Sequence, residues 1–196
     1  MLNLQGNDMQ TAEMADANIK LKCVRLKKDG MPHEAMSFPA FDFTELINTD
    51  WYDSSIREEF CEWKLMFFVF RDNDDGEPVF ERVLFWNVPN SIVDGVIKRM
   101  YESAAKLIAS GDGFELVNGE VRDVFPKENR NSNGVCHIRP HGRDKSDQMV
   151  LPVPDKKTGI TTFTKQAFWF NRSFIEKTIK ELIDMEVSDI DLGKRL

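Results

Sequence analysis

Alternation of apolar and charged residues near the start of the chain predicts a strand. Residues 19–26 read IKLKCVRL, a period-two pattern that would place Ile19, Leu21 and Cys23 inward and the charged side chains outward. The segment SFPAFDF (37–43) is aromatic and interrupted by proline, which lacks the N–H that an inner strand needs. We therefore expect this second segment to be extended at the edge of a sheet.

Later segments predict a central strand, two hairpins and a long helix. Residues 64–70 (KLMFFVF) are apolar on both faces, as in a central strand, and residues 79–87 follow after a loop rich in Asp. Residues 90–111 carry apolar positions at helical spacing and end at a glycine. The pair Asn118-Gly119 lies between two short strand-like runs and predicts a type I′ turn, which needs two positive φ angles.

The remaining segments complete a mixed α/β fold. We expect helices at 8–17, 44–62 and 173–183 and a short strand at 134–139, and residues 163–170 are rich in aromatic side chains. No repeat or linker divides the chain. We therefore expect one domain at 19–186, between an N-terminal leader with a short helix (1–18) and a C-terminal tail (187–196).

Length and composition fit a globular protein and exclude several other classes. The 196 residues are 41% hydrophobic and include 15 Phe and 4 Trp, which is too apolar for a disordered chain. The apolar runs are too short to span a bilayer, and the first ten residues lack the features of a signal peptide. The three cysteines are widely spaced, so we expect reduced thiols in a cytoplasmic protein without a membrane partner.

Charge is unevenly distributed, which matters for the kind of partner the protein can bind. The formal net charge of −7 argues by itself against a nucleic-acid partner. However, acids gather in 42–62, 72–81 and 181–191, whereas 20–28 and 127–145 are rich in Lys and Arg. Because a phosphate backbone responds to the local field, an acidic protein can still bind DNA through one basic face.

Cysteine and histidine give little support for catalysis or metal binding. Cys136 and His137 are adjacent, so on a strand they would point to opposite faces and cannot form a nucleophile–base pair. A zinc site from these two residues and His141 lacks a fourth ligand and a standard spacing. No GxGxxG or P-loop pattern occurs. We therefore expect structural roles for the thiols, no metal site and no cofactor.

The polar segment GVCHIRPHGRDKSD (134–147) is a better candidate for binding. It combines two His, two Arg and a Lys with a proline and a glycine, which predict an exposed loop after a strand. Arg can form two hydrogen bonds to a phosphate or to a guanine edge, and His can donate to either. The alternative is a solvated turn without a partner.

The aromatic segment TKQAFWFNRSF (164–174) is the second candidate. Phe168 and Phe170 would face inward on a strand, so Trp169 would point away from them, beside Lys165. An exposed indole next to cations fits stacking on a base or wedging into a base step. The alternative is an aromatic core.

The order of these segments resembles the MutH family, which comprises the mismatch-repair strand-nicking endonuclease and the type II restriction endonucleases that cut GATC. The resemblance covers residues 13–183 through IKLKCVR, DGMPHEAMSFPAFDF, WKLMFFVF, LFWNVP, HIRPH and TKQAFWFNRSF. EAMSFPAFDF and LFWNVP look most like the second, C-terminal MutH-like domain of such restriction enzymes. The resemblance implies a restriction-endonuclease-like fold, with a mixed five-stranded sheet flanked by helices and a DNA cleft between two lobes.

The metal-binding strand of the family is altered in this chain. Cleaving members carry an Asp and, about seven residues later, a Glu-x-Lys, and the two acids hold the Mg²⁺ that activates water. Here Lys22 matches the lysine, Lys20 stands in place of the second acid, and Glu13 precedes Lys20 by seven positions. An ammonium group there removes a ligand and repels the cation. The resemblance therefore implies no cleavage, unless Glu34 or Asp16 serves as a substitute ligand.

The DNA-contacting features of the family are better kept. The Arg of its IRP segment corresponds to Arg139, the aromatic of its F-aromatic-L segment to Trp169, and a lysine of its central strand to Lys64. The resemblance and the basic loop together predict DNA contacts from Arg139, His141, Arg143, Trp169, Lys165, Lys64 and Lys22.

Three functions remain open from the sequence. The first is a non-cleaving domain that binds specific double-stranded DNA sites, GATC in particular. It would act as an allosteric module beside a catalytic MutH-like domain of the same enzyme, if the chain is a fragment. The second is an active Mg²⁺-dependent endonuclease with rearranged ligands near Lys22. The third is a protein-interaction module with an exposed apolar patch around Trp51 and Trp63. We favour the first.

Overall fold

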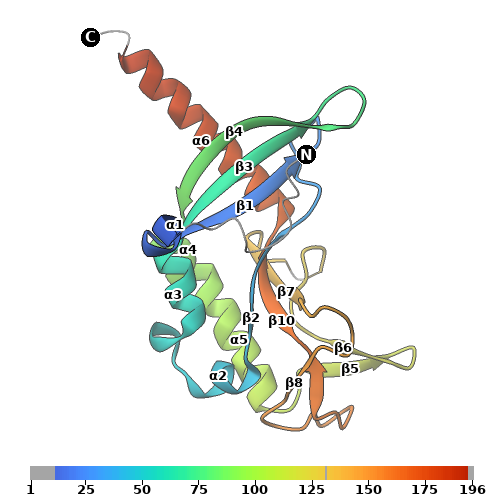
Figure 1. Ribbon diagram of the computed structural model, residues 1–196. Coiled ribbons are helices and arrows are strands. Elements are labelled where there is room, and N and C mark those ends of the chain that lie inside the picture. The colour runs from blue at the N-terminus through green and yellow to red at the C-terminus, as the bar shows by residue number, and fades with distance from the viewer. Residues whose placement is uncertain (1–11, 131, 194–196) are drawn as a thin grey trace. The chain divides into compact units, whose positions relative to one another are not determined.

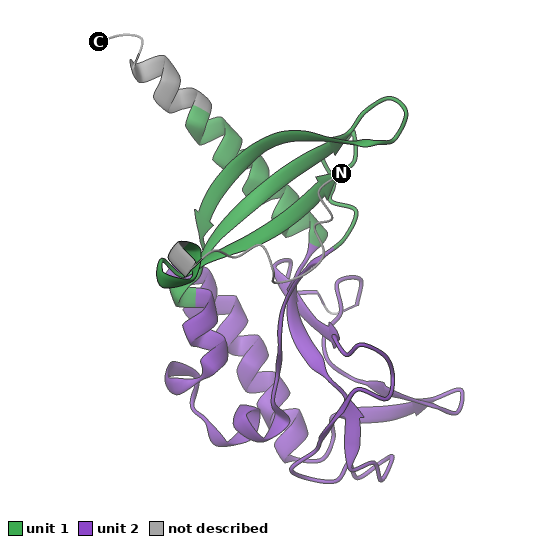
Figure 2. Cartoon of the chain, in the orientation of Figure 1, with its two compact units in different colours: residues 1–34, 61–88, 172–196 green, residues 35–60, 89–171 purple. Residues whose placement is uncertain are grey.

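The computed structural model describes residues 12–130 and 132–193, and the side chains of residues 12, 13 and 187–193 lie outside that description. Helices and strands are interspersed along the chain, as predicted for a mixed α/β protein (Figure 1). They form two compact units, which Figure 2 colours separately. Unit 1 comprises residues 1–34, 61–88 and 172–196, and unit 2 comprises 35–60 and 89–171.

Unit 1 contains a mixed three-stranded sheet with a helix on one face. Its elements are α1 (Ala12–Asp16), β1 (Ile19–Leu26), β3 (Lys64–Asp72), β4 (Pro78–Asn87) and α6 (Arg172–Gly193). The central strand β3 pairs antiparallel with β4 in the predicted hairpin, and it also pairs in parallel with β1. Val24, Phe67 and Leu84 are buried on one face. On that same face Trp86 packs against Phe174 of α6, with ring centroids 5.9 Å apart.

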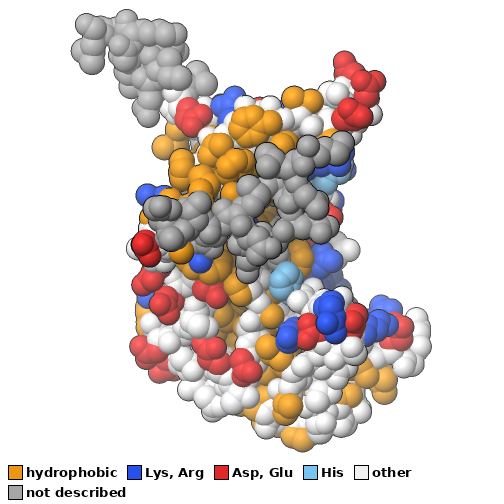
Figure 3. Space-filling view, in the orientation of Figure 1, with side chains coloured by type: hydrophobic (Ala, Val, Ile, Leu, Met, Phe, Trp, Pro, Cys, Tyr) orange, Lys and Arg blue, Asp and Glu red, His pale blue; other side chains and the backbone are white. Residues whose placement is uncertain are grey.

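The other face of this sheet is apolar and partly exposed. Phe80 and Phe85 of β4 expose 53% and 54% of their surface. Figure 3 shows orange hydrophobic side chains over the sheet of unit 1. Cys23 lies on this face and is exposed, so its predicted inward orientation is wrong. The reason is that α6 covers the opposite face, which carries the buried Val24 and Leu26.

Unit 2 contains a second three-stranded sheet, with helices on one face. The strands of unit 2 as a whole are β2 (Met36–Phe41), β5 (Phe114–Val117), β6 (Glu120–Asp123), β7 (Cys136–Pro140), β8 (Gln148–Val150), β9 (Thr162–Thr164) and β10 (Gln166–Phe170). Its helical segments are α2 (Phe43–Asn48), η2 (Trp51–Asp53), α3 (Ser55–Glu62, which ends in unit 1), α4 (Asn90–Ile92), η3 (Val93–Ile97) and α5 (Lys98–Ala109). The antiparallel sheet has the order β2-β10-β7, so β2 lies at an edge, as predicted. Phe38, Phe168 and Phe170 pack against Phe60 of α3 and form an aromatic core.

Two hairpins stand beside this sheet in unit 2. β5 and β6 are joined by Asn118 and Gly119, whose φ angles of 52° and 82° confirm the predicted type of turn. β8 pairs with β9 in the second hairpin, which the sequence did not predict. The described strands therefore fall into two three-stranded sheets and two hairpins, and not into the single five-stranded sheet that was expected.

The helices differ from the prediction in extent. The predicted helix at 44–62 is interrupted between α2 and α3, and α2 begins where Asp42 accepts hydrogen bonds from the backbone N–H groups of Thr44 and Glu45. The final helix continues to Gly193, beyond its predicted end. Of the predicted helix at 8–17, residues 8–11 lie outside the described part of the chain. Within that part, no helix combines the length and the apolar character needed to cross a bilayer.

A partly buried polar contact joins the helices of unit 2. Asp94, in the π-helical segment η3, accepts hydrogen bonds from Trp51 Nε1 at 2.8 Å and from Arg57 Nε at 2.9 Å. The Arg57 hydrogen bond, followed by that of Trp51, lowers the pKa of Asp94. Trp51 is only 3% exposed, so the apolar surface patch predicted around it is wrong. Trp63, the other tryptophan of that prediction, is half-buried.

Candidate nucleic-acid interface

Trp169 lies on the opposite face of the unit 2 sheet from the aromatic core. Successive residues of a strand point to opposite faces, and Phe168 and Phe170 fill the core on the other side. Trp169 is paired with His137 of β7 and is half-buried. The structure therefore orients this indole as the sequence led us to expect.

Arg139 and His141 surround the Trp169 ring. The guanidinium carbon of Arg139 lies 4.6 Å from the ring centroid, and the His141 ring meets the indole edge-on, with centroids 5.3 Å apart. Both side chains are exposed. We refer to Arg139, His141 and Trp169 as the Trp169 cluster. An exposed cation–π contact is worth about 0.5–1 kcal/mol, so the guanidinium is positioned by the indole without being immobilised.

Buried polar groups support this cluster from the same strands. His137 Nδ1 lies 2.7 Å from Asn171 Oδ1, and Asn171 Nδ2 donates to Ser132 Oγ at 3.0 Å. Burial lowers the pKa of His137, which keeps the imidazole neutral near pH 7. Burial also raises the pKa of the Cys136 thiol to about 12, so this thiol is not a nucleophile. Both side chains are therefore buried and held by neighbouring groups, which favours structural roles for them.

Ion pairs hold cations at the loop after β7. Lys165 Nζ lies 2.8 Å from Asp147 Oδ1, and Asp147 Oδ2 accepts the backbone N–H of Arg143 at 3.0 Å. The Lys165 hydrogen bond lowers the pKa of Asp147. The Arg143 side chain is 83% exposed. Lys165 is therefore held by Asp147, whereas the exposed Arg143 is held by a looser contact of 3.4 Å between its Nε and Asp144 Oδ2.

The remaining predicted DNA contacts, Lys22 and Lys64, belong to unit 1. In the β1–β3 register Lys64 pairs with Ile19, while Lys22 pairs with Phe67, so the two lysines lie on opposite faces of the same sheet. Lys22 is half-buried and Lys64 is exposed. These two residues are therefore not brought into one site within unit 1.

The strand that the resemblance identifies with the metal-binding strand of the family is β1. Lys20 lies on the same face as Lys22, with its Nζ 5.0 Å from the centroid of the Trp63 ring. Glu13 falls in α1, and its side chain is outside the described part of the chain. Among the described residues, the side chains of Asp, Glu, His and Cys form no group of three that could hold a metal ion.

Sequence reasoning missed a groove that includes Arg139. It has a volume of about 1390 Å³, and its cationic lining consists of Arg122, Lys127, Arg130, Arg139 and Lys145. Four of these cations lie in 127–145, which the charge pattern singled out. Arg122 comes from β6 and the threonines of the groove from the β9 segment, and only the folded chain brings them together.

Comparisons with known proteins give one informative result. A search of family models finds no match to this chain. The chain is 28% identical to the type II restriction enzyme Sau3AI of Staphylococcus aureus, in an alignment that covers 93% of this chain. It covers 44% of that enzyme, so the chain spans less than half the length of this relative. Membership of the MutH family stays a prediction, but the chain is homologous over most of its length to a type II restriction enzyme.

Proposed function

We propose that this chain binds a specific double-stranded DNA site, with GATC as the sequence, and does not cleave it. The observation that carries the proposal is the exposed guanidinium of Arg139 above Trp169, in a chain homologous to a type II restriction enzyme. The GATC sequence comes from the resemblance to the MutH family. Because the relative is more than twice as long, we also propose that residues 19–186 act beside a catalytic domain, as an allosteric module.

The Trp169 cluster suits base recognition. A guanidinium can donate two hydrogen bonds to O6 and N7 of guanine in the major groove. Arg139 is held against the indole ring, so it loses less side-chain freedom on binding than an unsupported arginine would. His141 and Arg143 are exposed near it along the chain and suit phosphate contacts, which set the register of a protein on DNA. Trp169 supplies apolar area for a base.

The absence of cleavage is proposed from the residues of β1. Metal-dependent hydrolysis needs two acids that converge on Mg²⁺, and Lys20 stands where the resemblance places one of them. The ammonium group lies over Trp63, on the face shared with Lys22. A positive charge next to the metal position opposes the binding of a divalent cation.

Equilibrium binding tests the proposal. Fluorescence anisotropy would compare a duplex that contains GATC with a duplex of the same composition that lacks it, at one fixed salt concentration. We expect at least about tenfold preference for GATC. Arg139→Ala should weaken binding to GATC by about 1–3 kcal/mol and reduce the preference.

A matched control is Arg99→Ala, which removes an exposed arginine of α5 in the same unit. It changes the net charge equally and should leave the preference unchanged. Equal affinity of the wild-type chain for both duplexes would contradict specific recognition.

A further inference from the structure

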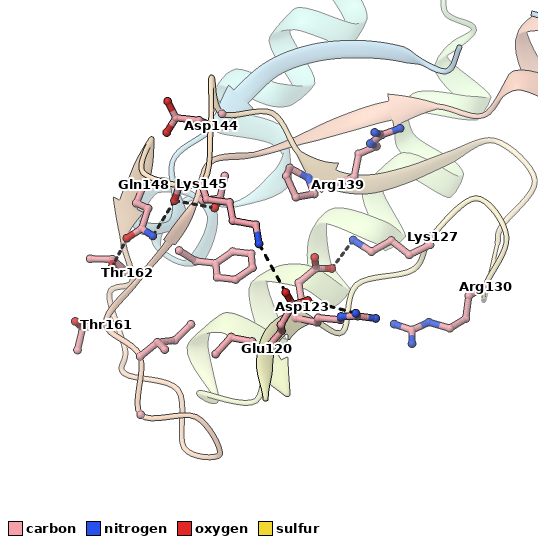
Figure 4. A pocket seen from close by; sticks show the side chains of 18 of the residues that line it. Glu120, Asp123, Lys127, Arg130, Arg139, Asp144, Lys145, Gln148, Thr161 and Thr162 are labelled. Atoms are coloured by element: carbon pink, nitrogen blue, oxygen red, sulfur yellow. Dashed lines mark hydrogen bonds and ion pairs between the residues drawn. The ribbon is translucent and has the colours of Figure 1, made fainter. Parts of the chain in front are cut away.

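Charged side chains line the groove of unit 2 together with apolar ones. Figure 4 shows Glu120, Lys127, Arg130 and Lys145 around it. Threonines 161, 162 and 164 of the β9 segment add hydroxyl groups. Its volume of about 1390 Å³ exceeds the roughly 300–1,000 Å³ of typical small-molecule pockets. The size of the groove therefore suits an extended ligand, and the cations on its walls suit an anionic one.

Three of the cations that line the groove are only weakly paired. Arg122 lies 3.4 Å and Lys145 lies 3.8 Å from Glu120, and Arg130 lies 4.0 Å from Glu115. Charge-assisted hydrogen bonds are typically about 2.7–2.9 Å long, so these contacts are loose. Exposed ion pairs of this kind exchange partners at little cost.

Lys127 behaves differently from these three cations. Its Nζ lies 2.5 Å from Asp123 Oδ1 and donates to the carbonyl oxygen of Ile138 at 2.8 Å. Burial lowers the pKa of Lys127. Lys127 therefore joins β6 to β7, and we assign it a structural role.

Glu120 is the carboxylate of the groove that faces the loosely held cations. Of the other two carboxylates in the lining, Asp123 is buried beside Lys127. Asp144 accepts hydrogen bonds from the backbone and the hydroxyl of Ser146, and in Figure 4 its carboxylate points away from Glu120. Glu120 is exposed, and it links β6 to the loop that carries Lys145.

We propose that this groove binds the phosphodiester backbone of double-stranded DNA, and that Glu120 occupies the phosphate position when DNA is absent. Arg122, Arg130 and Lys145 then contact phosphates, and Glu120 competes with DNA for Arg122 and Lys145. Because Arg139 also lines the groove, the backbone track continues into the Trp169 cluster. The inference rests on the proposed function and adds a sequence-independent phosphate site to it.

The test uses the anisotropy assay with both duplexes over a range of salt concentrations. Glu120→Gln should raise the affinity for both duplexes by about two- to fivefold, because the competing charge is removed. The matched control is Glu102→Gln, which breaks an ion pair of the same 3.8 Å length with Lys98 on α5. Arg122→Ala and Lys145→Ala should each lower both affinities and reduce the slope of log K against log salt by roughly 0.9.

The outcomes separate this inference from the proposed function. If Glu120→Gln matches Glu102→Gln and the salt slopes do not change, while the wild-type chain still prefers GATC, the groove proposal is wrong and the proposed function stands. If the slopes change as expected but the wild-type chain binds both duplexes equally, the groove proposal stands and site-specific recognition is wrong. If no duplex is retained by the wild-type chain, both are overturned.

Discussion

Strands β1 and β7 each place a cation over a tryptophan, and the two pairs differ in exposure. In unit 1 the Nζ of Lys20 lies 5.0 Å from the Trp63 ring centroid, and in unit 2 the guanidinium carbon of Arg139 lies 4.6 Å from that of Trp169. Lys20 is half-buried, on the sheet face that α6 contacts, whereas Arg139 is exposed. The same contact can therefore serve as internal packing in one unit and can present a charge to a partner in the other.

The proposed groups for DNA binding and the proposed metal position lie in different units. The lysine at position 20 is accommodated by packing against Trp63. The groups that we propose for DNA recognition lie in unit 2, on other strands. The proposed loss of metal chemistry in unit 1 therefore leaves the proposed recognition groups of unit 2 unchanged.

The largest expected effect comes from removing each tryptophan. Trp63→Ala and Trp169→Ala both remove half-buried rings, and each should lower the free energy of unfolding by about 1.5–3 kcal/mol, less than the 3–5 kcal/mol of a fully buried ring. Trp169→Ala should also weaken DNA binding at least tenfold, because Arg139 loses its support and a base loses a contact.

Urea unfolding and anisotropy on the same preparations would measure both effects. Trp63→Ala serves as the control for a loss of stability without a loss of binding. Equal DNA affinities of the two variants would show that the two cation–tryptophan pairs do not differ in function.

The next effect comes from restoring an acid in β1. Lys20→Glu changes the strand to the pattern that the resemblance associates with Mg²⁺. At 10 mM, Mg²⁺ would be at about ten times the dissociation constant of a weak site. Binding at that concentration raises the free energy of unfolding by about 1.4 kcal/mol. We expect this Mg²⁺-dependent rise in thermal stability for Lys20→Glu and none for the wild-type chain. A Mg²⁺-dependent rise in the wild-type chain would mean that its acids already converge on a metal.

The smallest effect is a pH dependence of stability from His137. Because burial lowers its pKa in the folded state, the unfolded chain binds more protons below the ordinary value of about 6.5. Stability should therefore fall as the pH is lowered from about 6.5 through the folded-state pKa, by at most about 1.4 kcal/mol per pH unit. Urea midpoints at a series of pH values would measure it, with His137→Gln as the comparison. The same slope in His137→Gln would assign the effect to other groups.

Local patterns predicted the strands of unit 1 and the turn at Asn118 and Gly119, because these depend on neighbouring residues. They failed for Cys23, whose orientation depends on which face of the sheet α6 covers. They also failed for the groove, because the position of Arg122 beside Lys145 follows from how the hairpins lie in unit 2. The periodicity of a strand predicts which side chains share a face. Which element packs against each face depends on the tertiary fold.

The opposite orientation of Lys22 and Lys64 could have been derived once the strand register was known. In a parallel pair, side chains at paired positions share a face, and Lys64 pairs with Ile19, an odd number of residues from Lys22. The sequence contains both lysines but does not contain the register. The resemblance predicts DNA contacts for both lysines, but the structure places them on opposite faces of the sheet.

The most direct test of non-cleaving recognition is one incubation read on two gels. Wild-type chain, Mg²⁺ and an end-labelled duplex with a single GATC site would be mixed at low ionic strength, then divided between a native and a denaturing gel. We predict a retarded complex on the native gel and full-length strands on the denaturing gel. A fragment cut at GATC, or no retarded complex at all, would contradict the proposal.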